Sequence, residues 1–459
     1  MRFLFTSLQT YESEFYGIVQ RDLEQRGHET AHVTVSRAAA RELREQGLRA
    51  WCLHDLIGEL PSADLTNEVA RIESTYPIPH LRDVYRGDYA IAGWDELPSQ
   101  QRAVDTFRAL ERIFDDVQPD VVCPEVGNEG IRVTAHTIAL ARNIPTLFLL
   151  FTIFPKPLRV YADTVHARAV DPGEVRELTS GEREEVEAFR RSFTERAKPI
   201  RDYRRVPIEW RRVGVLKNHI AQKTREDGDN EYLRPWRLLE TNVSEKARAL
   251  AARPFYDHLS ADRPFVYFPL HVTDDYKIKR IIPHAVDQAS LIEQVADALP
   301  SGYDIVLKEH PMSVGRNSVA LLRRLRKRHN VKLVNAYTST HELIERSEAV
   351  VVIGSTVGLE ALLYDKPVLT MGDPYYAGYG VTLDLTSFVD IRERVPELLR
   401  FQPDPERIRR FLHAMMRSCF PGKPLLVDRS PENARVIAST LELAATHVRA
   451  KHTVGALSP

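Results

Sequence analysis

Apolar and polar positions alternate along the chain in two different rhythms. Residues 2–7 (RFLFTS) are largely apolar, as in a buried strand, whereas residues 12–28 carry apolar side chains at helical spacing. A second strand-like stretch follows at residues 30–36. A strand, a helix and a second strand in this order are typical of a parallel sheet covered by helices. We therefore expect an α/β domain that occupies residues 1–170.

The same order returns in the second half of the chain. Amphipathic helical stretches separate five strand-like ones, at residues 263–271, 302–311, 331–335, 349–355 and 366–373. Successive β/α pairs of this kind build a parallel, doubly wound sheet. The sequence thus predicts a second α/β domain over residues 256–430, followed by a C-terminal helix and tail at residues 431–459.

Between the two domains, residues 171–255 are rich in charged, helix-forming residues and lack long β-branched runs. We expect a charged helical insertion or linker there. Within it, residues 196–225 hold ten Lys and Arg residues against two acids, interleaved with Trp210 and aliphatic side chains. Such a run is either a solvated helical face or an interfacial segment attracted to anionic lipid or to a polyanionic acceptor. Both interpretations stay open.

Charge and cysteine content exclude several classes of protein. The chain of 459 residues has 63 Lys and Arg against 64 Asp and Glu, so no overall positive charge points to nucleic acid as a partner. Its three cysteines are far apart and lack the spacing of a disulfide scaffold or a structural zinc site. The sequence has neither a secretory signal pattern nor an uncharged stretch of membrane-spanning length. We expect a soluble, cytoplasmic protein.

The most informative stretch is AVVVIGSTVGLEALLYD, at residues 349–365. A continuous apolar strand ends in Gly354, Ser355 and Thr356, and a helix follows directly. Small residues and the free N–H groups at a helix start favour an anionic phosphate. Glu360, one turn later, is placed to accept hydrogen bonds from ribose hydroxyls. The alternative is an ordinary strand–turn–helix connection with a serine or threonine cap.

Two further strand ends carry polar side chains. Lys308, His310 and Pro311 end the stretch GYDIVLKEHP, and His271 ends RPFVYFPLH. The residue before a proline is disfavoured in a helix, so His310 should lie on a loop. Ligands of open α/β sheets bind at the carboxyl ends of the strands. We therefore expect these side chains and the Gly-Ser-Thr turn to lie along one edge of the second sheet.

These stretches are similar to those of a known protein family. The C-terminal half resembles the bacterial capsule polysaccharide biosynthesis glycosyltransferases, which include Kdo transferases and are related in layout to sialyltransferases that use CMP-sialic acid. The matching pieces are VYFPLHVTDD, PHAVDQASLIEQVADALPSGYDIVLKEHPM and VVVIGSTVGLEALLYDKPVLTMGDPYY. PDVVCPEVGNEG and FPKPLRVYADTVHA match more loosely. Phe151 and Thr152 stand where the resemblance leads us to expect a Glu, so the role of that acid does not carry over.

The resemblance implies a GT-B architecture, with two Rossmann-like domains facing each other across a cleft. The C-terminal domain would hold a nucleotide-activated sugar, with a CMP-sugar such as CMP-Kdo or CMP-sialic acid favoured, and the N-terminal domain a surface or capsular glycan acceptor. His310 and Pro311 would contact the nucleotide, and Ser355 and Thr356 its phosphate. Such enzymes use the nucleotide-sugar as co-substrate, without a bound metal or other cofactor, although the pair Asp274-Asp275 keeps a metal in question.

Glycosyl transfer also needs a carboxylate on the acceptor side, either to deprotonate the acceptor hydroxyl or to stabilise the oxocarbenium-like centre. The candidates are Glu125 and Glu129, in the loop after the strand-like DVVCP. We prefer Glu129, because it opens a helix whose N-terminus favours an ionised carboxylate. The alternative is that both residues only cap that helix.

Three other functions fit the same layout. A nucleotide-sugar 2-epimerase would act without an acceptor, and a CDP-polyol phosphotransferase has a similar His-Pro pair and strand–Ser–helix connection. A non-catalytic nucleotide- or glycan-binding protein would bind without turnover. The residues of the Pro-Leu-His and Gly-Ser-Thr-Val-Gly stretches favour the capsule-type transferase over these three alternatives.

Overall fold

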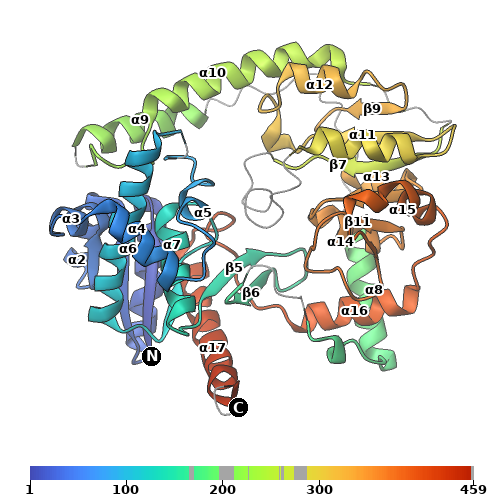
Figure 1. Ribbon diagram of the computed structural model, residues 1–459. Coiled ribbons are helices and arrows are strands. Elements are labelled where there is room, and N and C mark those ends of the chain that lie inside the picture. The colour runs from blue at the N-terminus through green and yellow to red at the C-terminus, as the bar shows by residue number, and fades with distance from the viewer. Residues whose placement is uncertain are drawn as a thin grey trace. The chain divides into compact units, whose positions relative to one another are not determined.

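The computed structural model describes residues 1–91, 93–164, 170–195, 211–225, 227–257, 259, 263–272 and 287–455. The chain divides into two compact units (Figure 1). Unit 1 combines Met1–Ala167, Trp210–Trp236 and Cys419–Pro459, and unit 2 combines Arg168–Glu209 and Arg237–Ser418.

Unit 1 is built on a four-stranded parallel sheet. Its strand order is β3-β2-β1-β4, with β1 at Arg2–Ser7, β2 at Glu29–Thr34, β3 at Ala50–Cys52 and β4 at Val121–Cys123. A two-stranded antiparallel hairpin of β5 (Leu147–Phe151) and β6 (Leu158–Ala162) accompanies the sheet. The helices of this unit are α1 (Thr10–Gln25), α2 (Arg37–Glu45), α3 (Leu53–Gly58), α4 (Leu65–Thr75), α5 (Arg82–Tyr85), α6 (Glu96–Val117), α7 (Gly130–Ala141), α9 (Arg211–Arg225) and α17 (Pro431–Gly455).

Unit 2 is built on a six-stranded parallel sheet. Its strand order is β12-β11-β10-β7-β8-β9, with β7 at Phe265–Pro269, β8 at Asp304–Lys308, β9 at Val331–Val334, β10 at Ala349–Val352, β11 at Val368–Thr370 and β12 at Leu383–Asp384. Its helices are α8 (Ser180–Glu195), α11 (Gln288–Ala298), α12 (Val319–Leu325), α13 (Thr340–Arg346), α14 (Thr356–Leu362), α15 (Ile391–Leu398) and α16 (Pro405–Arg417). Helix α10 (Pro235–Ala252) begins in unit 1 and continues into unit 2.

The expected α/β fold class, with two Rossmann-like parallel sheets, is confirmed. Each sheet buries apolar strands of the kind that the sequence pattern indicated. In unit 1, Phe3 and Phe5 are fully buried on one face of the sheet, and Leu4 on the other belongs to a second apolar cluster. Strand β10 in unit 2 is buried at every position. Strands buried on both faces read as continuous apolar runs, because both faces are covered by helices.

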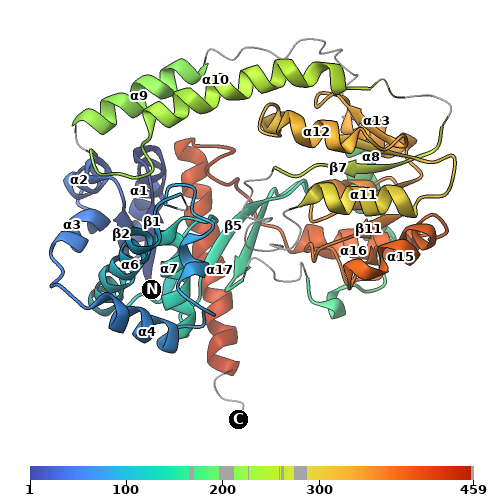
Figure 2. The ribbon, with the colours of Figure 1, turned by 45° about the horizontal axis from the view of Figure 1, so that its top comes forward.

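The order of the domains along the chain differs from the expected one. The expected division was 1–170, 171–255, 256–430 and 431–459, but the stretch 171–255 is shared between the two units and the C-terminal helix belongs to unit 1. Helix α17 packs along α1 (Figure 2) because Ile437 and Leu441 are fully buried in the core beside Phe15. A pattern within one helix cannot show which sheet receives its apolar face.

The segment before α10 also joins unit 1 through specific contacts. The Asp227 carboxylate accepts hydrogen bonds from Ser36 Oγ at 2.7 Å and from the Arg37 N–H at 2.6 Å. Glu231 accepts two hydrogen bonds from Arg102. The ionised form of Glu231 is favoured, because Arg102 and His54 lie beside it and lower its pKa to about 2. These buried contacts fix residues that a charged linker would leave in solvent.

Candidate functional site

The polar strand ends of unit 2 lie on three neighbouring strands. Strand β7 lies between β10 and β8 in the parallel sheet, so their carboxyl ends meet at one edge. His271 follows β7, Lys308 ends β8, and the turn that begins at Gly354 follows β10. This arrangement brings together residues that lie more than eighty positions apart in the sequence. It is the edge at which open α/β sheets bind ligands.

The turn after β10 is a well-held helix start. Ser355 is the N-cap of α14, and its Oγ accepts a hydrogen bond from the Val357 N–H at 3.2 Å. Both Ser355 and Thr356 are partly exposed. The serine hydroxyl oxygen therefore caps the helix, as in an ordinary strand–turn–helix connection. Its O–H proton is not used by the cap and can still be donated to a ligand.

Lys308 lies behind this turn and is buried. Its Nζ donates a hydrogen bond to Thr340 Oγ1 at 2.5 Å. Burial lowers the pKa of Lys308 to about 8, while the nearby Glu360 carboxylate acts in the opposite direction. Burial raises the pKa of Glu360, although Lys308 and the Thr356 hydroxyl favour its ionised form. A lysine and a carboxylate therefore stabilise each other beneath the turn, and the ribose contact expected of Glu360 stays a prediction.

After Glu309, the chain that follows β8 passes from the interior to the surface. Glu309 is 1% exposed and accepts hydrogen bonds from Tyr256 Oη and, at 2.7 Å, from Asn317 Nδ2. His310 and Pro311 are exposed, and the Ser313 N–H donates to the His310 carbonyl at 2.7 Å. The loop position expected for His310 is thus what the structure has, with Glu309 anchoring the strand end from inside.

In unit 1, Glu129 does not cap helix α7 with its side chain. That role belongs to Asp88, whose Oδ2 accepts a hydrogen bond from the Gly130 N–H at 2.8 Å. Glu129 is buried and its Oε2 lies 3.0 Å from Arg132 Nη1. The interpretation of Glu129 as a capping side chain is therefore wrong, because Asp88 already occupies the helix start and Arg132 holds the carboxylate.

Glu125 lies in an unusual backbone conformation. Its φ angle is 60°, in the left-handed region that residues other than glycine rarely adopt. The Tyr16 hydroxyl donates a hydrogen bond to Glu125 Oε1. Burial raises the pKa of Glu125, and the nearby Arg132 guanidinium opposes this effect. Strained backbone and a carboxyl group with a raised pKa are both features that gather at functional sites.

Two residues of this cluster were not predicted from the sequence. The Arg132 guanidinium bridges two carboxylates, with Nη2 donating to Glu12 Oε1 at 2.9 Å and Nη1 to Glu129. Glu12 also accepts a hydrogen bond from the Leu8 N–H at 2.7 Å. The spacing of Glu129 and Arg132, three residues apart on a helical stretch, is a signal for the first pair. Glu12 is brought in only by the pairing of β1 with β4.

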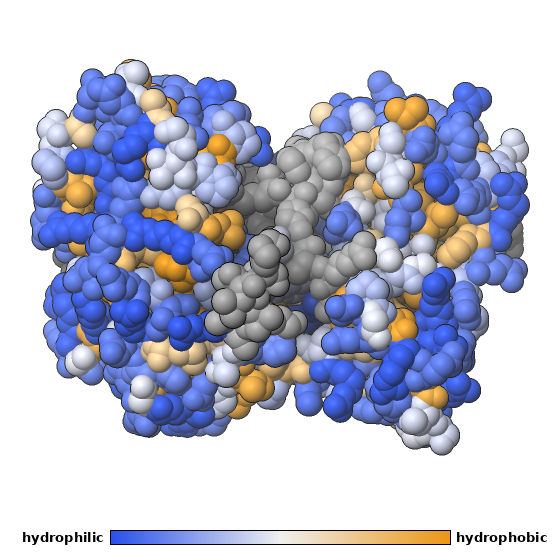
Figure 3. Space-filling model, turned by 60° about the horizontal axis from the view of Figure 1, so that its bottom comes forward, coloured by the Kyte–Doolittle hydropathy of each residue, from blue (hydrophilic) through white to orange (hydrophobic). Residues whose placement is uncertain are grey.

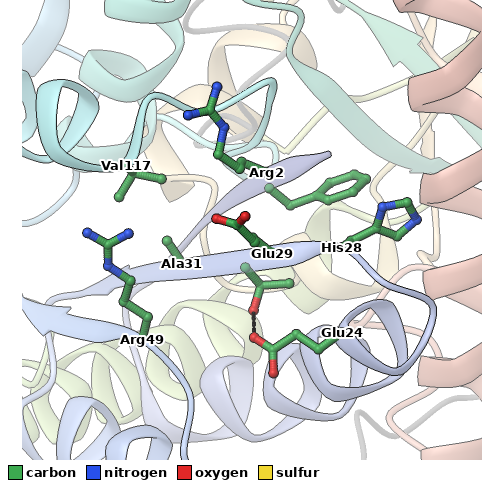
Figure 4. A pocket seen from close by; sticks show the side chains of 9 residues that line it. Arg2, Glu24, His28, Glu29, Ala31, Arg49 and Val117 are labelled. Atoms are coloured by element: carbon green, nitrogen blue, oxygen red, sulfur yellow. Dashed lines mark hydrogen bonds between the residues drawn. The ribbon is translucent and has the colours of Figure 1, made fainter.

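A separate pocket lies at the opposite edge of the first sheet (Figure 4). Arg2, His28, Glu29 and Arg49 line it, around the amino ends of β1 and β2. Acidic side chains pair with all three of these bases: Arg2 Nε lies 3.6 Å from Asp120, Arg49 Nη2 lies 2.6 Å from Asp116, and His28 pairs with Glu442. The candidate carboxylates Glu125 and Glu129 follow β4 at the opposite, carboxyl edge of the same sheet, so this pocket is separate from them.

Among the described residues, no group of three or more His, Cys, Asp or Glu side chains could hold a metal ion. Asp274 and Asp275 lie outside the described residues, so the expectation of a metal-independent site stays a prediction. None of the helices in those same residues combines the length and the apolar character that crossing a bilayer requires.

Comparison with known proteins gives a family match that lies mostly in unit 2. Residues 222–407 match the family described as "Capsule polysaccharide biosynthesis protein". Protein FixF of Sinorhizobium fredii is 37% identical over 114 residues, which cover 24% of this chain and 27% of FixF. Capsule polysaccharide modification protein LipA of Neisseria meningitidis serogroup A is 33% identical over 100 residues, covering 21% of this chain and 14% of LipA.

The matches thus span about a quarter or less of these relatives. Among solved structures, the beta Kdo 2,7 transferase KpsC of Thermosulfurimonas dismutans is 16% identical with a TM-score of 0.33, over 70% of this chain and 87% of that one. This likeness is too distant to bear on function. The family match covers Lys308, His310 and the turn at Gly354, which are the motifs that carried the resemblance in the sequence. Residues 222–407 are therefore similar to the capsule polysaccharide biosynthesis family.

Proposed function

We propose that the protein is a glycosyltransferase that moves a sugar from a nucleotide-activated donor, with a CMP-sugar favoured, to a surface or capsular glycan. The observation that carries this proposal is the meeting of three polar strand ends at one edge of the second sheet, within the region that matches the capsule biosynthesis family. The donor would lie there, with His310 and Pro311 at the nucleotide and Ser355 and Thr356 at its phosphate.

The charges around the turn suit departure of a phosphate. As the bond between sugar and phosphate breaks, negative charge grows on the phosphate oxygens, and fixed donors aimed at that charge lower the barrier. The Ser355 hydroxyl supplies such a donor, and Thr356, whose hydroxyl contacts Glu360, can supply its backbone N–H at the start of α14. Lys308, with a pKa of about 8, is still largely protonated at neutral pH and adds positive potential from behind the turn.

For the acceptor side we now prefer Glu125 over Glu129 as the base. Glu129 is held by Arg132 at 3.0 Å, which favours a carboxylate fixed in an ion pair. The pKa of Glu125 is raised by burial, which brings it nearer to the operating pH, where a general base works best. Tyr16 fixes the orientation of its carboxyl group.

The proposal is tested by thermal unfolding in the presence of CMP, CDP, UDP and GDP. A ligand that binds only the folded state raises the unfolding temperature. We expect selective stabilisation by CMP. Conversion of a nucleotide-sugar without any acceptor would instead support an epimerase, transfer of a polyol phosphate from a CDP-polyol would support a phosphotransferase, and binding without turnover would support a sensor. Stabilisation by none of the four nucleotides contradicts the proposal.

Replacing His310 or Ser355 by Ala is expected to weaken binding of the stabilising nucleotide. Each change removes one polar contact to an anionic ligand, worth about 1–3 kcal/mol. Isothermal titration calorimetry measures the change. Ser318→Ala is the matched control, because Ser318 caps α12 of the same unit, with its Oγ accepting from the Leu321 N–H at 3.1 Å. If all three variants bind the nucleotide like the wild type, the site assignment is wrong.

A membrane surface is the proposed second partner, because capsule-type acceptors are often lipid-linked. Residues 196–210 lie outside the described residues, and the remainder of the basic run forms α9, whose sequence RRVGVLKNHIAQKTR contains no acid. Exposed apolar side chains follow on α10, where Trp236 is 78% and Val243 62% exposed. The face drawn in Figure 3 is largely hydrophilic, with apolar residues scattered over it. Basic and apolar side chains together suit an anionic lipid surface.

We expect the protein to co-sediment with anionic liposomes at low salt and to be released at high salt. Each Lys or Arg near an anionic surface contributes about 1 kcal/mol, and this attraction is screened by salt. A variant with Arg204, Arg205, Arg211 and Arg212 changed to Ser should bind much less, and neutral liposomes are the control. No binding of the wild type at low salt excludes docking, and unchanged binding of the variant places the contact elsewhere.

A further inference from the structure

The turn after β10 is held by two side chains that come from other parts of unit 2. The Gly354 N–H donates a hydrogen bond to His271 Nε2 at 3.2 Å. One residue later, the Ser355 carbonyl accepts a hydrogen bond from Tyr376 Oη at 2.5 Å. Gly354, His271 and Tyr376 are all buried. Two consecutive residues of the turn are therefore fixed through their backbone atoms.

His271 is itself held in place from helix α11. The Gln288 side-chain amide binds the His271 backbone at two points, with Oε1 accepting from the His271 N–H at 2.9 Å and Nε2 donating to its carbonyl at 3.3 Å. Gln288 is the first residue of α11 and is 7% exposed. The contact runs from Gln288 through His271 to Gly354, and it joins the end of β7 to the turn after β10.

Tyr376 is fixed just as closely. Its side chain is fully buried, and a Cβ atom added to Gly358 would lie 2.1 Å from its hydroxyl oxygen. Gly358 therefore leaves room for Tyr376 and not for a ligand. Burial raises the pKa of Tyr376 well above its usual value, so its hydroxyl keeps the proton that it donates to the Ser355 carbonyl.

We propose that His271 and Tyr376 are positioning residues that clamp the Gly354–Ser355 turn in the geometry that receives the donor phosphate, and that His271 does not bind the donor itself. This inference rests on the proposed function, because it assumes that the turn receives a phosphate. It changes the role expected for His271, which the sequence grouped with the donor-binding residues. The Gly354 N–H already donates a hydrogen bond to the imidazole of His271. The polar groups of Ser355 and Thr356 therefore remain to bind the phosphate.

Because His271 Nε2 accepts the hydrogen bond from the Gly354 N–H, a substitution that keeps an acceptor there should preserve the geometry of the turn. A glutamine can place its side-chain oxygen near the position of a histidine Nε2 and accept the same hydrogen bond, whereas alanine cannot. His271→Gln should therefore retain what His271→Ala loses. Tyr376→Phe removes only the hydroxyl, and leaves the ring that packs against Gly358.

The test combines amide hydrogen exchange of the peptide around Gly354 with calorimetric binding of CMP. Loss of one hydrogen bond opens a backbone amide to exchange, and we expect about tenfold faster exchange at Gly354 in His271→Ala, with about tenfold weaker CMP binding. His271→Gln should remain within about threefold of the wild type in both measurements. Tyr376→Phe should weaken CMP binding by about fivefold with the unfolding temperature nearly unchanged.

His413→Ala is the matched control, because His413 is another buried histidine of unit 2, on α16, and should leave the exchange at Gly354 unchanged. The proposal is overturned if His271→Ala changes neither measurement, or if His271→Gln is as impaired as His271→Ala in both. If the exchange follows the expected pattern but wild-type protein does not bind CMP, the clamp stands and the proposed CMP donor is what fails.

Discussion

Replacing Glu125 by Gln is expected to lower the rate of sugar transfer by about a hundredfold or more while donor binding stays nearly unchanged. The amide keeps the size of the carboxyl group and its hydrogen bond with Tyr16, but it cannot take a proton from the acceptor hydroxyl. Donor binding should be unaffected because the donor residues belong to the other unit. Steady-state kinetics and nucleotide titration separate the two effects.

The pH dependence of the rate gives an independent readout. Burial raises the pKa of Glu125, so the basic form appears at a higher pH than for an ordinary glutamate, and the rate should rise through that pH in the wild type only. A raised pKa in the folded state also means that ionisation destabilises the fold as the pH rises through this range. Glu125→Gln should therefore unfold at the same or a higher temperature at neutral pH.

Glu129→Gln is the matched comparison for this prediction. Its carboxylate is paired with Arg132, so we expect a smaller loss of rate, accompanied by a loss of stability. A full rate in Glu125→Gln together with a hundredfold loss in Glu129→Gln would return the catalytic role to Glu129. Equal loss of rate and of donor affinity in Glu125→Gln would make that residue structural.

Replacing Arg132 by Met is expected to lower the free energy of unfolding by about 3–5 kcal/mol, because it leaves buried carboxylates without their counter-charge. Arg132 is 8% exposed and lies between Glu12 and Glu129, at 2.9 and 3.0 Å. Burial alone would disfavour the charged guanidinium, but the three neighbouring carboxylates more than compensate and raise its pKa. Urea titration followed by fluorescence measures the loss.

Arg142→Met is the control for this change. Arg142 pairs with Asp115 at 2.6 Å close to the end of the same helix, but the aspartate side chain is 69% exposed. Exposed pairs contribute about 0–1 kcal/mol, so the control should lose little. A second variant that combines Arg132→Met with Glu12→Gln should recover part of the stability, because fewer carboxylates are then left unpaired. Similar losses in Arg132→Met and Arg142→Met would show that the buried cluster is not held by this charge.

The parts of the fold that depend on local pattern could be predicted from the sequence. The apolar runs that became β1, β8 and β10 were apparent because strands buried on both faces are continuously apolar. The turn after β10 was apparent because small residues stand between an apolar run and a helical one. The placement of His271, Lys308 and Gly354 at one edge followed from the parallel order of the strands.

Other features depend on contacts between distant segments and could not be predicted. The cap of α7 comes from Asp88, which lies about forty residues earlier, so local position alone could not exclude the alternative that Glu125 and Glu129 cap this helix. The return of α17 to unit 1 depends on which of two sheets accepts its apolar face. The positioning role of His271 could not be predicted from its residue type or from its place in the sequence. Only the structure shows that its side chain accepts a hydrogen bond from the Gly354 N–H.

A crystal structure of the protein with bound CMP would show where the donor nucleotide lies. We expect the nucleotide at the carboxyl ends of β7, β8 and β10, with its phosphate at Ser355 and Thr356 and with the Gly354 N–H still donating its hydrogen bond to His271. A nucleotide bound in the pocket between Arg2, His28 and Arg49, or a phosphate that takes the Gly354 N–H away from His271, would contradict this expectation.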